Sequence, residues 1–264
     1  EAFFAAYGRD AHVRLDGIHI HIGSPIYSPA PYVQAIEKVL GLIERLRASG
    51  FGVGVLDVGG GFAADYARGA SPTASAYAAE IVPLLRGRGL EVVLEPGRQI
   101  ACNAGVLLTR VLYVKRGGEK TFAIADAAMT DLIRPALYEA AHFVYPARLP
   151  VGAKPPVRTP DYAAAGGQAV DIVGGVCETS DVLAAGRVLP PLTRGDLLAI
   201  FSAGAYGFVM ASQYNSRPRA PEVLVDADTW RVIRRRETYE DLWAAERLGC
   251  AETSTNTDDT DNAG

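Results

Sequence analysis

Three consecutive glycines, Gly59, Gly60 and Gly61, follow an apolar run that is typical of a strand. Glycine lets the backbone approach an anion closely and point its N–H groups at it, and a helix N-terminus beyond adds a favourable dipole. Ser24 and Arg98 follow two other apolar runs and offer a hydroxyl and a planar fork of charged donors. The glycines alone also fit a simple tight turn. Together, the three features indicate a phosphate site.

Glu95 and two histidines lie in the same stretches of sequence. Glu95 directly follows an apolar run, where a carboxylate would keep a heteroaromatic nitrogen protonated and make a pyridine ring an electron sink; an ordinary surface glutamate is the alternative. His19 and His21 share one face of a strand, which fits either an HxH metal site or an imidazole stacked on a planar cofactor. The metal interpretation lacks further ligands, because His12 and His142 fall outside any ligand-like cluster.

The second half of the chain carries a different set of candidates. Arg134 and Tyr138 are four residues apart, on one face if the segment is helical, and Arg134 suits bidentate binding of a carboxylate. Cys177 and Glu178 follow an apolar strand, where a buried, inert cysteine is an equally good interpretation. Tyr206 lies in a turn bounded by glycines, which places an aromatic hydroxyl at a bend of the chain.

Residues 1–105 contain the elements that must position the first set. Short apolar runs alternate with helical patterns there, as in βα units on a parallel sheet. We expect strands at 15–21, 53–58 and 90–94 and helices at 29–49 and 74–88. Because sites in parallel α/β folds form at the carboxyl ends of strands, the loops bearing Ser24, the glycines and Glu95 should meet.

After about residue 105 the pattern changes to short β runs separated by turns. We expect strands at 106–114, 121–125, 169–176, 196–201 and 222–225, with one helix at 131–141. This pattern predicts an antiparallel β domain over residues 106–250. Residues 251–264 are polar and acidic without an apolar face, and we expect them to be disordered.

The composition is that of an ordinary globular protein, with 264 residues, 49% of them hydrophobic, and a net charge of −4. No apolar run approaches the roughly 20 residues of a membrane span, and no leader is visible, so we expect a cytoplasmic protein that does not contact membranes. Three widely spaced cysteines suit a reducing compartment. The net negative charge does not indicate a surface that binds nucleic acid. We expect the basic run 234–236 to be a solvated surface.

Taken in order, these segments resemble the pyridoxal-phosphate decarboxylases of the alanine-racemase-like class (fold type III), and among them the diaminopimelate decarboxylase family. The segments that carry the resemblance are GIHIHIGS (17–24), LDVGGGF (56–62), LEPGRQIACNAG (94–105), DLIRPALYEAAH (131–142), VCETSDVLA (176–184) and GAYGFVMASQYNSRPRAPEVLV (204–225). Several of them are shared with ornithine and arginine decarboxylases. The RPALY run and the Cys177–Glu178 pair favour the diaminopimelate branch.

The resemblance implies the C-terminal part of a cofactor-binding (β/α)8 TIM-type barrel, about its last three βα units, followed by a β-sandwich or barrel domain. It implies pyridoxal 5'-phosphate as cofactor, with these contacts: His21 on the ring, Glu95 at the pyridine nitrogen, Ser24, Gly59, Gly60, Gly61, Gly97 and Arg98 around the phosphate, and Tyr206 against the cofactor. Arg98, Arg134, Tyr138 and Glu178 would bind the amino-acid substrate, and Cys177 would reprotonate the carbanion. The family forms homodimers with shared active sites, so Cys177 and Glu178 would act in trans. The reaction would convert meso-2,6-diaminopimelate to L-lysine and CO2.

One departure from the family concerns lysine. The family's Schiff-base lysine lies in an AxKAN-like strand that this sequence lacks, and its four lysines, Lys38, Lys115, Lys120 and Lys154, do not follow parallel strands. With about three of eight barrel strands visible, we expect a fragment, inactive alone, that lacks roughly 130–160 residues of the barrel. A non-catalytic relative that regulates a decarboxylase, and a metal-dependent barrel hydrolase built on the HxH pair, remain as alternatives.

Overall fold

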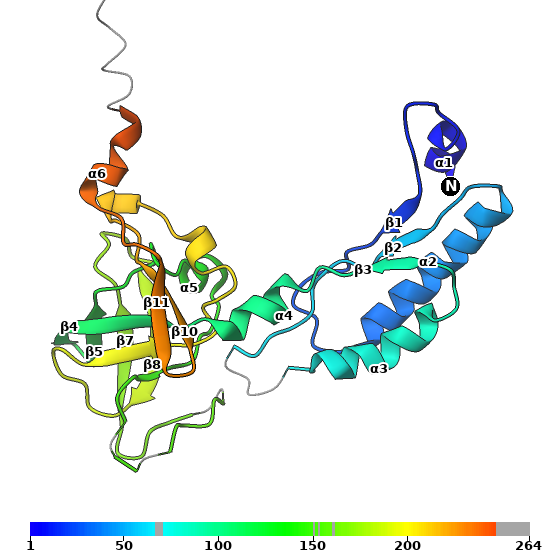
Figure 1. Ribbon diagram of the computed structural model, residues 1–264. Coiled ribbons are helices and arrows are strands. Elements are labelled where there is room, and N and C mark those ends of the chain that lie inside the picture. The colour runs from blue at the N-terminus through cyan, green and yellow to red at the C-terminus, as the bar shows by residue number, and fades with distance from the viewer. Residues whose placement is uncertain (67–70, 150, 153, 160–161, 247–264) are drawn as a thin grey trace, which may run out of the picture.

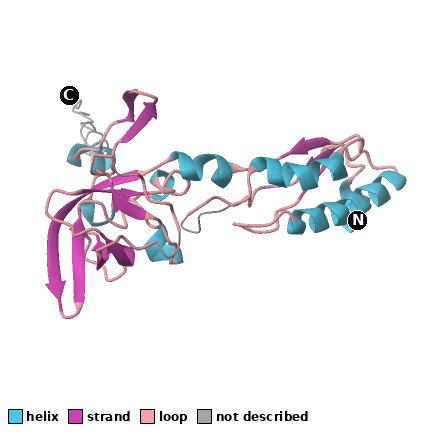
Figure 2. Cartoon of the chain, turned by 90° about the horizontal axis from the view of Figure 1, so that it is seen from below, coloured by secondary structure: helices cyan, strands magenta, loops and turns pink. Residues whose placement is uncertain are grey.

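The structure is a computed structural model that describes residues 1–66, 71–149, 151–152, 154–159 and 162–246 (Figure 1). The chain forms two lobes, joined by the short helices α4 (Gly97–Ala101) and η1 (Cys102–Ala104). Seen from below, the first lobe is mostly helical and the second mostly strands (Figure 2). None of the helices in the described ranges combines the length and apolar composition of a membrane span. The expected disorder of 251–264 lies outside the described residues.

A three-stranded parallel sheet is the framework of the first lobe. Its strands, in sheet order, are β1 (Gly17–His19), β2 (Val55–Asp57) and β3 (Glu91–Val93). Helix α1 (Ala2–Tyr7) precedes the sheet, and the connecting helices are α2 (Ala30–Ala48) and α3 (Ala74–Leu85). The expected alternation of strand and helix is therefore present, with strands shorter than the apolar runs that predicted them. The described residues form an open sheet of three strands, not a closed barrel.

Helix α2 covers one face of this sheet. Its buried apolar residues recur at helical spacing and form a single stripe, made of Tyr32, Ile36, Val39, Leu40, Ile43 and Leu46. The stripe belongs to the same core as Leu56 of β2 and Ile18 of β1, which are register partners. The next pair in register, His19 and Asp57, therefore points to the opposite face, where His19 is exposed and Asp57 half-buried.

The second lobe is built on a six-stranded sheet in the order β6-β9-β4-β5-β7-β8. Its strands are β4 (Leu107–Gly117), β5 (Lys120–Ala125), β6 (Val144–Pro146), β7 (Gln168–Val173), β8 (Val182–Leu189) and β9 (Leu197–Ile200). The expectation of an antiparallel domain is wrong at one pairing, because β5 and β7 run parallel. Between them the chain passes through α5 (Arg134–Tyr138) and β6, a connection long enough to return in the same direction. The sheet is therefore mixed.

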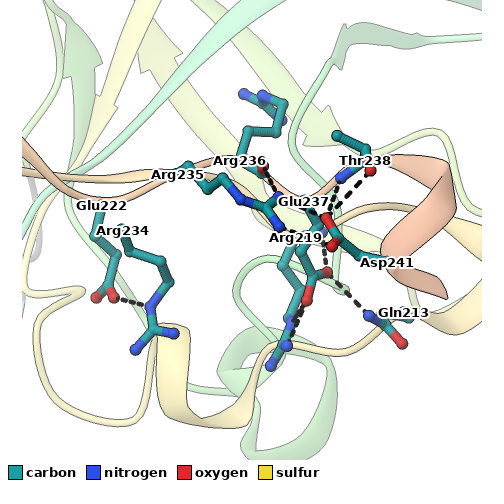
Figure 3. A network of polar contacts seen from close by, with 9 residues as sticks. All are labelled: Gln213, Arg219, Glu222, Arg234, Arg235, Arg236, Glu237, Thr238 and Asp241. Carbon is teal, nitrogen blue, oxygen red and sulfur yellow. Dashed lines mark hydrogen bonds and ion pairs between the residues drawn. The ribbon is translucent and has the colours of Figure 1, made fainter. Parts of the chain in front are cut away.

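A hairpin of β10 (Glu222–Asp226) and β11 (Thr229–Arg234) follows the 3-10 helices η2 (Phe208–Met210) and η3 (Tyr214–Ser216), and α6 (Tyr239–Leu242) follows the hairpin. Arg219 contacts the Glu237 carboxylate through two of its nitrogens, which lowers the pKa of Glu237 to about 2 (Figure 3). The predicted basic run is exposed, but two of its members are ion-paired: Arg234 with Glu222 and Arg235 with Asp241. The first pair joins the two strands of the hairpin, and the second joins the segment after the hairpin to α6.

The junction between the lobes is closely packed. The side-chain amide of Asn103 donates to the Ser202 hydroxyl over 2.8 Å, and that hydroxyl donates to the carbonyl of Asp65 over 2.6 Å. A Cβ at Gly204 would lie 1.9 Å from the carbonyl oxygen of Ala101, so only glycine fits there. The junction holds α4 and the turn around residue 206 in fixed positions.

Candidate functional site

The glycine run after β2 lies wedged between the loops that follow β1 and β3. A Cβ at Gly59 would be 2.3 Å from the carbonyl oxygen of Ile20, and one at Gly60 would be 2.5 Å from that of Glu95. Gly61 has a φ of +91°, and a Cβ there would be 2.1 Å from the carbonyl oxygen of Gly23. The glycines are therefore needed so that three loops can pack together, whereas the sequence had indicated only a bound anion or a simple tight turn as reasons for them.

The hydrogen bonds of this run leave two of its three backbone donors available, because the N–H of Gly59 donates to the Asp57 carboxylate over 2.8 Å. The carbonyl of Gly59 accepts from the backbone N–H of Glu95, and that of Gly60 from the Tyr32 hydroxyl, each over 2.9 Å. The carbonyl of Gly61 is also engaged, by a backbone N–H. Within the described ranges, no acceptor receives a hydrogen bond from the N–H of Gly60 or Gly61. Two such donors beside a cation form an anion-binding concavity.

Ser24 and Arg98 meet beside this run, as predicted from their positions after strands. Arg98 is the second residue of α4, which begins at Gly97, and its Nε donates to the Ser24 hydroxyl over 3.2 Å. The Arg98 guanidinium also lies 4.7 Å from the ring centroid of Tyr206. Tyr206 has a φ of +57°, so the turn that sequence reasoning identified presents this ring to Arg98.

Glu95 lies close to the first histidine of the pair. The Nε2 of His19 is 3.8 Å from the Glu95 carboxylate, and with Asp57 these groups lie within 4.8 Å of one another. The expectation that the histidines lack further ligands is therefore wrong, because the fold brings two carboxylates to His19. The donor set suits a divalent cation or a protonated heteroaromatic nitrogen. His21 lies two residues further on, where its Nδ1 accepts from the N–H of Gly23 over 3.3 Å.

Arg134 is the candidate most deeply buried in the second lobe, with 7% exposure. Its guanidinium lies 4.3 Å from the ring centroid of Tyr66, and its Nη1 donates to the Nε2 of His142 over 3.1 Å. Arg134 forms no ion pair among the residues that the structure describes. A buried guanidinium without an anionic partner is a strong candidate for binding a carboxylate.

From the sequence, His142 was considered only as a metal ligand and was set aside as lying outside any ligand-like cluster. In the structure it is completely buried at the centre of the contacts around Arg134. Because arginine only donates, the Nε2 of His142 must accept, and its Nδ1–H then donates to the carbonyl of Phe201 over 2.9 Å. Burial, with the nearby charges of Arg134 and Arg187, lowers the pKa of His142 to about 4. His142 is therefore neutral at neutral pH.

Tyr66 joins the two arginines and was not identified from the sequence. Its hydroxyl accepts a short hydrogen bond from Arg98, and its ring packs edge-on against His142, with centroids 5.3 Å apart. Nothing local distinguishes this tyrosine, because its partners come from α4, α5 and the segment before β6. The packing of the two lobes alone brings these groups together.

The remaining candidates lie apart from these groups. Cys177 and Glu178 are exposed in the loop between β7 and β8, and Tyr138 is 59% exposed at the end of α5. The buried carboxylate of Asp181 shapes the loop by accepting from the N–H groups of Met129 and Val176, each over 2.7 Å. In the described part of the chain, no hydrogen bond or ring contact joins these three candidates to either arginine.

The chain is similar to known decarboxylases along most of its length. The family described as "Pyridoxal-dependent decarboxylase, C-terminal sheet domain" matches residues 14–204. The diaminopimelate decarboxylase of Pseudomonas aeruginosa is 48% identical over 248 residues, which cover 94% of this chain and 56% of that protein. The one from Aquifex aeolicus is 43% identical, with 87% and 52% covered. The chain spans about half the length of the curated relatives that it matches.

Solved structures agree with these matches. Diaminopimelate decarboxylase from Helicobacter pylori, complexed with L-lysine, superposes with a TM-score of 0.82 at 38% identity, covering 94% of this chain and 58% of that one. The M. jannaschii enzyme in complex with L-lysine gives 0.82 at 32% identity, with 92% and 54% covered. A lysine/ornithine decarboxylase from Vibrio vulnificus, at 22% identity and a TM-score of 0.71, shares the fold. Since the family match extends over well more than half of the sequence, the chain belongs to the pyridoxal-dependent decarboxylases.

Proposed function

We propose that the full-length protein containing this chain is a pyridoxal-phosphate-dependent diaminopimelate decarboxylase, which converts meso-2,6-diaminopimelate to L-lysine and CO2. The proposal rests on one observation, which is that the chain contains two separate sites suited to anions. The donors at Gly60, Gly61, Ser24 and Arg98 suit a phosphate, while the unpaired guanidinium of Arg134 suits a carboxylate on the far end of a substrate. Relatives at 40–48% identity carry this enzyme's name, which supports the substrate assignment.

The residues at the ends of β1–β3 fit pyridoxal phosphate. Gly60, Gly61, Ser24 and Arg98 would hold the phosphate, with Gly97 at the start of the helix behind it. Glu95 would keep the pyridine nitrogen protonated, and the imidazole of His21 would stack on the ring. When bound, the cofactor would supply the electron sink for the electron pair that remains on the substrate carbon when CO2 leaves.

Other residues would act on the substrate. Arg134, with Tyr138 and Glu178, would hold the distal amino-acid end, and the ring of Tyr206 would contact the cofactor while steadying Arg98. The Sγ of Cys177 would deliver a proton to the carbon that has lost CO2. Cys177 and Glu178 are exposed and have no contact with the arginines of their own chain in the described ranges, which supports a homodimer in which they serve the site of a second subunit.

The first lobe also supports a barrel. Among the described residues, the helices packed on the three parallel strands lie on one face, and the other face carries His19 and Asp57, as the interior of a (β/α)8 barrel would. We therefore propose that residues 1–105 belong to a barrel completed by the rest of the full-length protein, and that 106–250 form the C-terminal domain. The protein would be cytoplasmic.

The test is an assay of the full-length protein with pyridoxal phosphate and meso-diaminopimelate, in which the appearance of L-lysine is measured. Ornithine and arginine serve as competing substrates. Lysine formation is expected. Turnover of ornithine or arginine without lysine formation would refute the substrate, and no turnover of any of the three would favour a non-catalytic relative that regulates a decarboxylase.

The role of Cys177 has a separate test. Cys177→Ala in the full-length protein should reduce kcat by about 100-fold or more, because a positioned proton donor contributes that much, while the affinity for pyridoxal phosphate stays unchanged. Absorbance titration measures the affinity and steady-state kinetics measure kcat. Equal losses of both quantities would instead indicate a structural cysteine.

A further inference from the structure

Tyr66 contacts both arginines of the proposed site and is almost completely buried, at 8% exposure. Its hydroxyl accepts from Nη1 of Arg98, and the face of its ring supports the guanidinium of Arg134 at 4.3 Å. The Arg98 guanidinium lies 5.7 Å from the centroid of the same ring. One rigid side chain thus fixes two cations, one from the helix α4 that joins the lobes and one from α5 of the second lobe.

In the described part of the chain, the side chains that contact the two arginines are all neutral. Arg98 is held by the hydroxyls of Ser24 and Tyr66 and by the ring of Tyr206. Arg134 is held by the ring of Tyr66 and by neutral His142. Neither arginine has an ion-pair partner among the described residues, so both retain their full charge for bound anions.

Tyr66 itself remains neutral because burial raises its pKa to about 12. The neighbouring Cys102 thiol also raises this pKa, and its Sγ donates to the carbonyl of Ser202 over 3.4 Å. The ring is therefore anchored at the junction of the lobes and has little freedom to rotate.

The geometry points to Tyr66 as a positioning residue that sets the spacing between Arg98 and Arg134, and hence between the phosphate site and the distal carboxylate site. This inference rests on the proposed function, which assigns those anions to the two arginines. Tyr66 would thereby contribute to selecting substrates whose second carboxylate lies at the correct distance from the reacting carbon.

The experiment uses the full-length protein and two variants of Tyr66. Tyr66→Phe removes the hydroxyl that holds Arg98 but keeps the ring under Arg134, whereas Tyr66→Leu removes both contacts. Tyr77→Phe is the matched control, because it also loses a buried hydroxyl of the first lobe, one that donates to the carbonyl of Ile26 over 2.6 Å. The first readout is the Kd of pyridoxal phosphate. The second is the pair of Kd values for L-lysine and 1,5-diaminopentane, measured with the protein loaded with cofactor. The two ligands differ in that 1,5-diaminopentane lacks the carboxylate of L-lysine.

Tyr66→Phe should weaken pyridoxal phosphate binding about tenfold without changing the preference for L-lysine over 1,5-diaminopentane. Tyr66→Leu should weaken cofactor binding similarly and also reduce that preference about tenfold, while Tyr77→Phe changes neither quantity. Unchanged cofactor affinity in Tyr66→Phe, or an unchanged preference in Tyr66→Leu, would overturn the inference. If Tyr66→Leu does not fold, the cofactor affinity of Tyr66→Phe decides.

Failure of the proposed function would look different. In that case the unmodified full-length protein would not form lysine from meso-diaminopimelate and would not prefer L-lysine to 1,5-diaminopentane. If the unmodified protein forms lysine but the Tyr66 variants keep its cofactor affinity and its preference for L-lysine, only the positioning role of Tyr66 is refuted.

Discussion

His142 is buried beside two guanidinium groups, and its protonation therefore opposes folding. Its pKa is about 4 in the folded chain, against an ordinary value of 6.5. Between these two pH values the unfolded chain binds a proton that the folded chain does not, so the free energy of unfolding decreases as the pH falls through this window. The loss due to His142 is on the order of 3 kcal/mol once the pH reaches the lower limit.

Urea unfolding of the full-length protein at several pH values between about 7 and 4 measures this effect. His142→Asn should be less stable at neutral pH but should lose less stability on acidification than the unmodified protein. His12→Asn, which removes an exposed histidine, is the control and should follow the unmodified protein. Parallel pH profiles for His142→Asn and the unmodified protein would contradict the prediction.

At the scale of residues, the sequence predicted the contacts between side chains that lie directly after strands of the same sheet. Ser24 and Arg98 were expected to meet because each follows a strand of one parallel sheet, and they do. Tyr66 and His142 could not be identified, since their importance depends on contacts between segments far apart in the chain. His142, for example, donates to the carbonyl of Phe201, 59 residues away, and no local pattern encodes such a contact.

At the scale of elements, the glycine run after β2 is a structural requirement as well as a candidate phosphate site. Gly61→Ala should destabilise the full-length protein by at least about 2 kcal/mol, because the residue has a positive φ and its Cβ would clash with the carbonyl of Gly23. Gly52→Ala is the matched control, since a Cβ there meets nothing within 4 Å and no positive φ is required. Chemical unfolding measures both, and equal stabilities would show that the loops are not packed as described.

Elements with strong periodicity were predicted well, and those without it were missed. The buried stripe of α2 placed that helix within one residue at each end. In contrast, β8 has small residues and a glycine at a positive φ, and β6 is three residues long and ends in proline, so neither carries a clear alternating pattern. The parallel pairing of β5 with β7 depends on a long connection whose path the sequence does not specify.

At the scale of the whole molecule, the parallel sheet needs further protein. Every residue of β3 is exposed, including Val92 at 38% and Val93 at 36%, and Leu94 beyond it is 49% exposed. An edge strand with exposed apolar side chains is normally covered or paired. The relatives, of which this chain spans about half, have the length to supply such a cover.

The lysines give a test of that view in the full-length protein. Lys38 is exposed on α2, Lys120 forms an ion pair with Asp171 at 2.9 Å in the second lobe, and neither Lys115 nor Lys154 lies at the ends of β1–β3. Borohydride reduction of the full-length protein loaded with pyridoxal phosphate, followed by peptide mapping, should therefore locate the cofactor on a lysine outside residues 1–264. An apparent attachment at one of the four lysines of this chain would mean that the site is not built at the carboxyl ends of these strands.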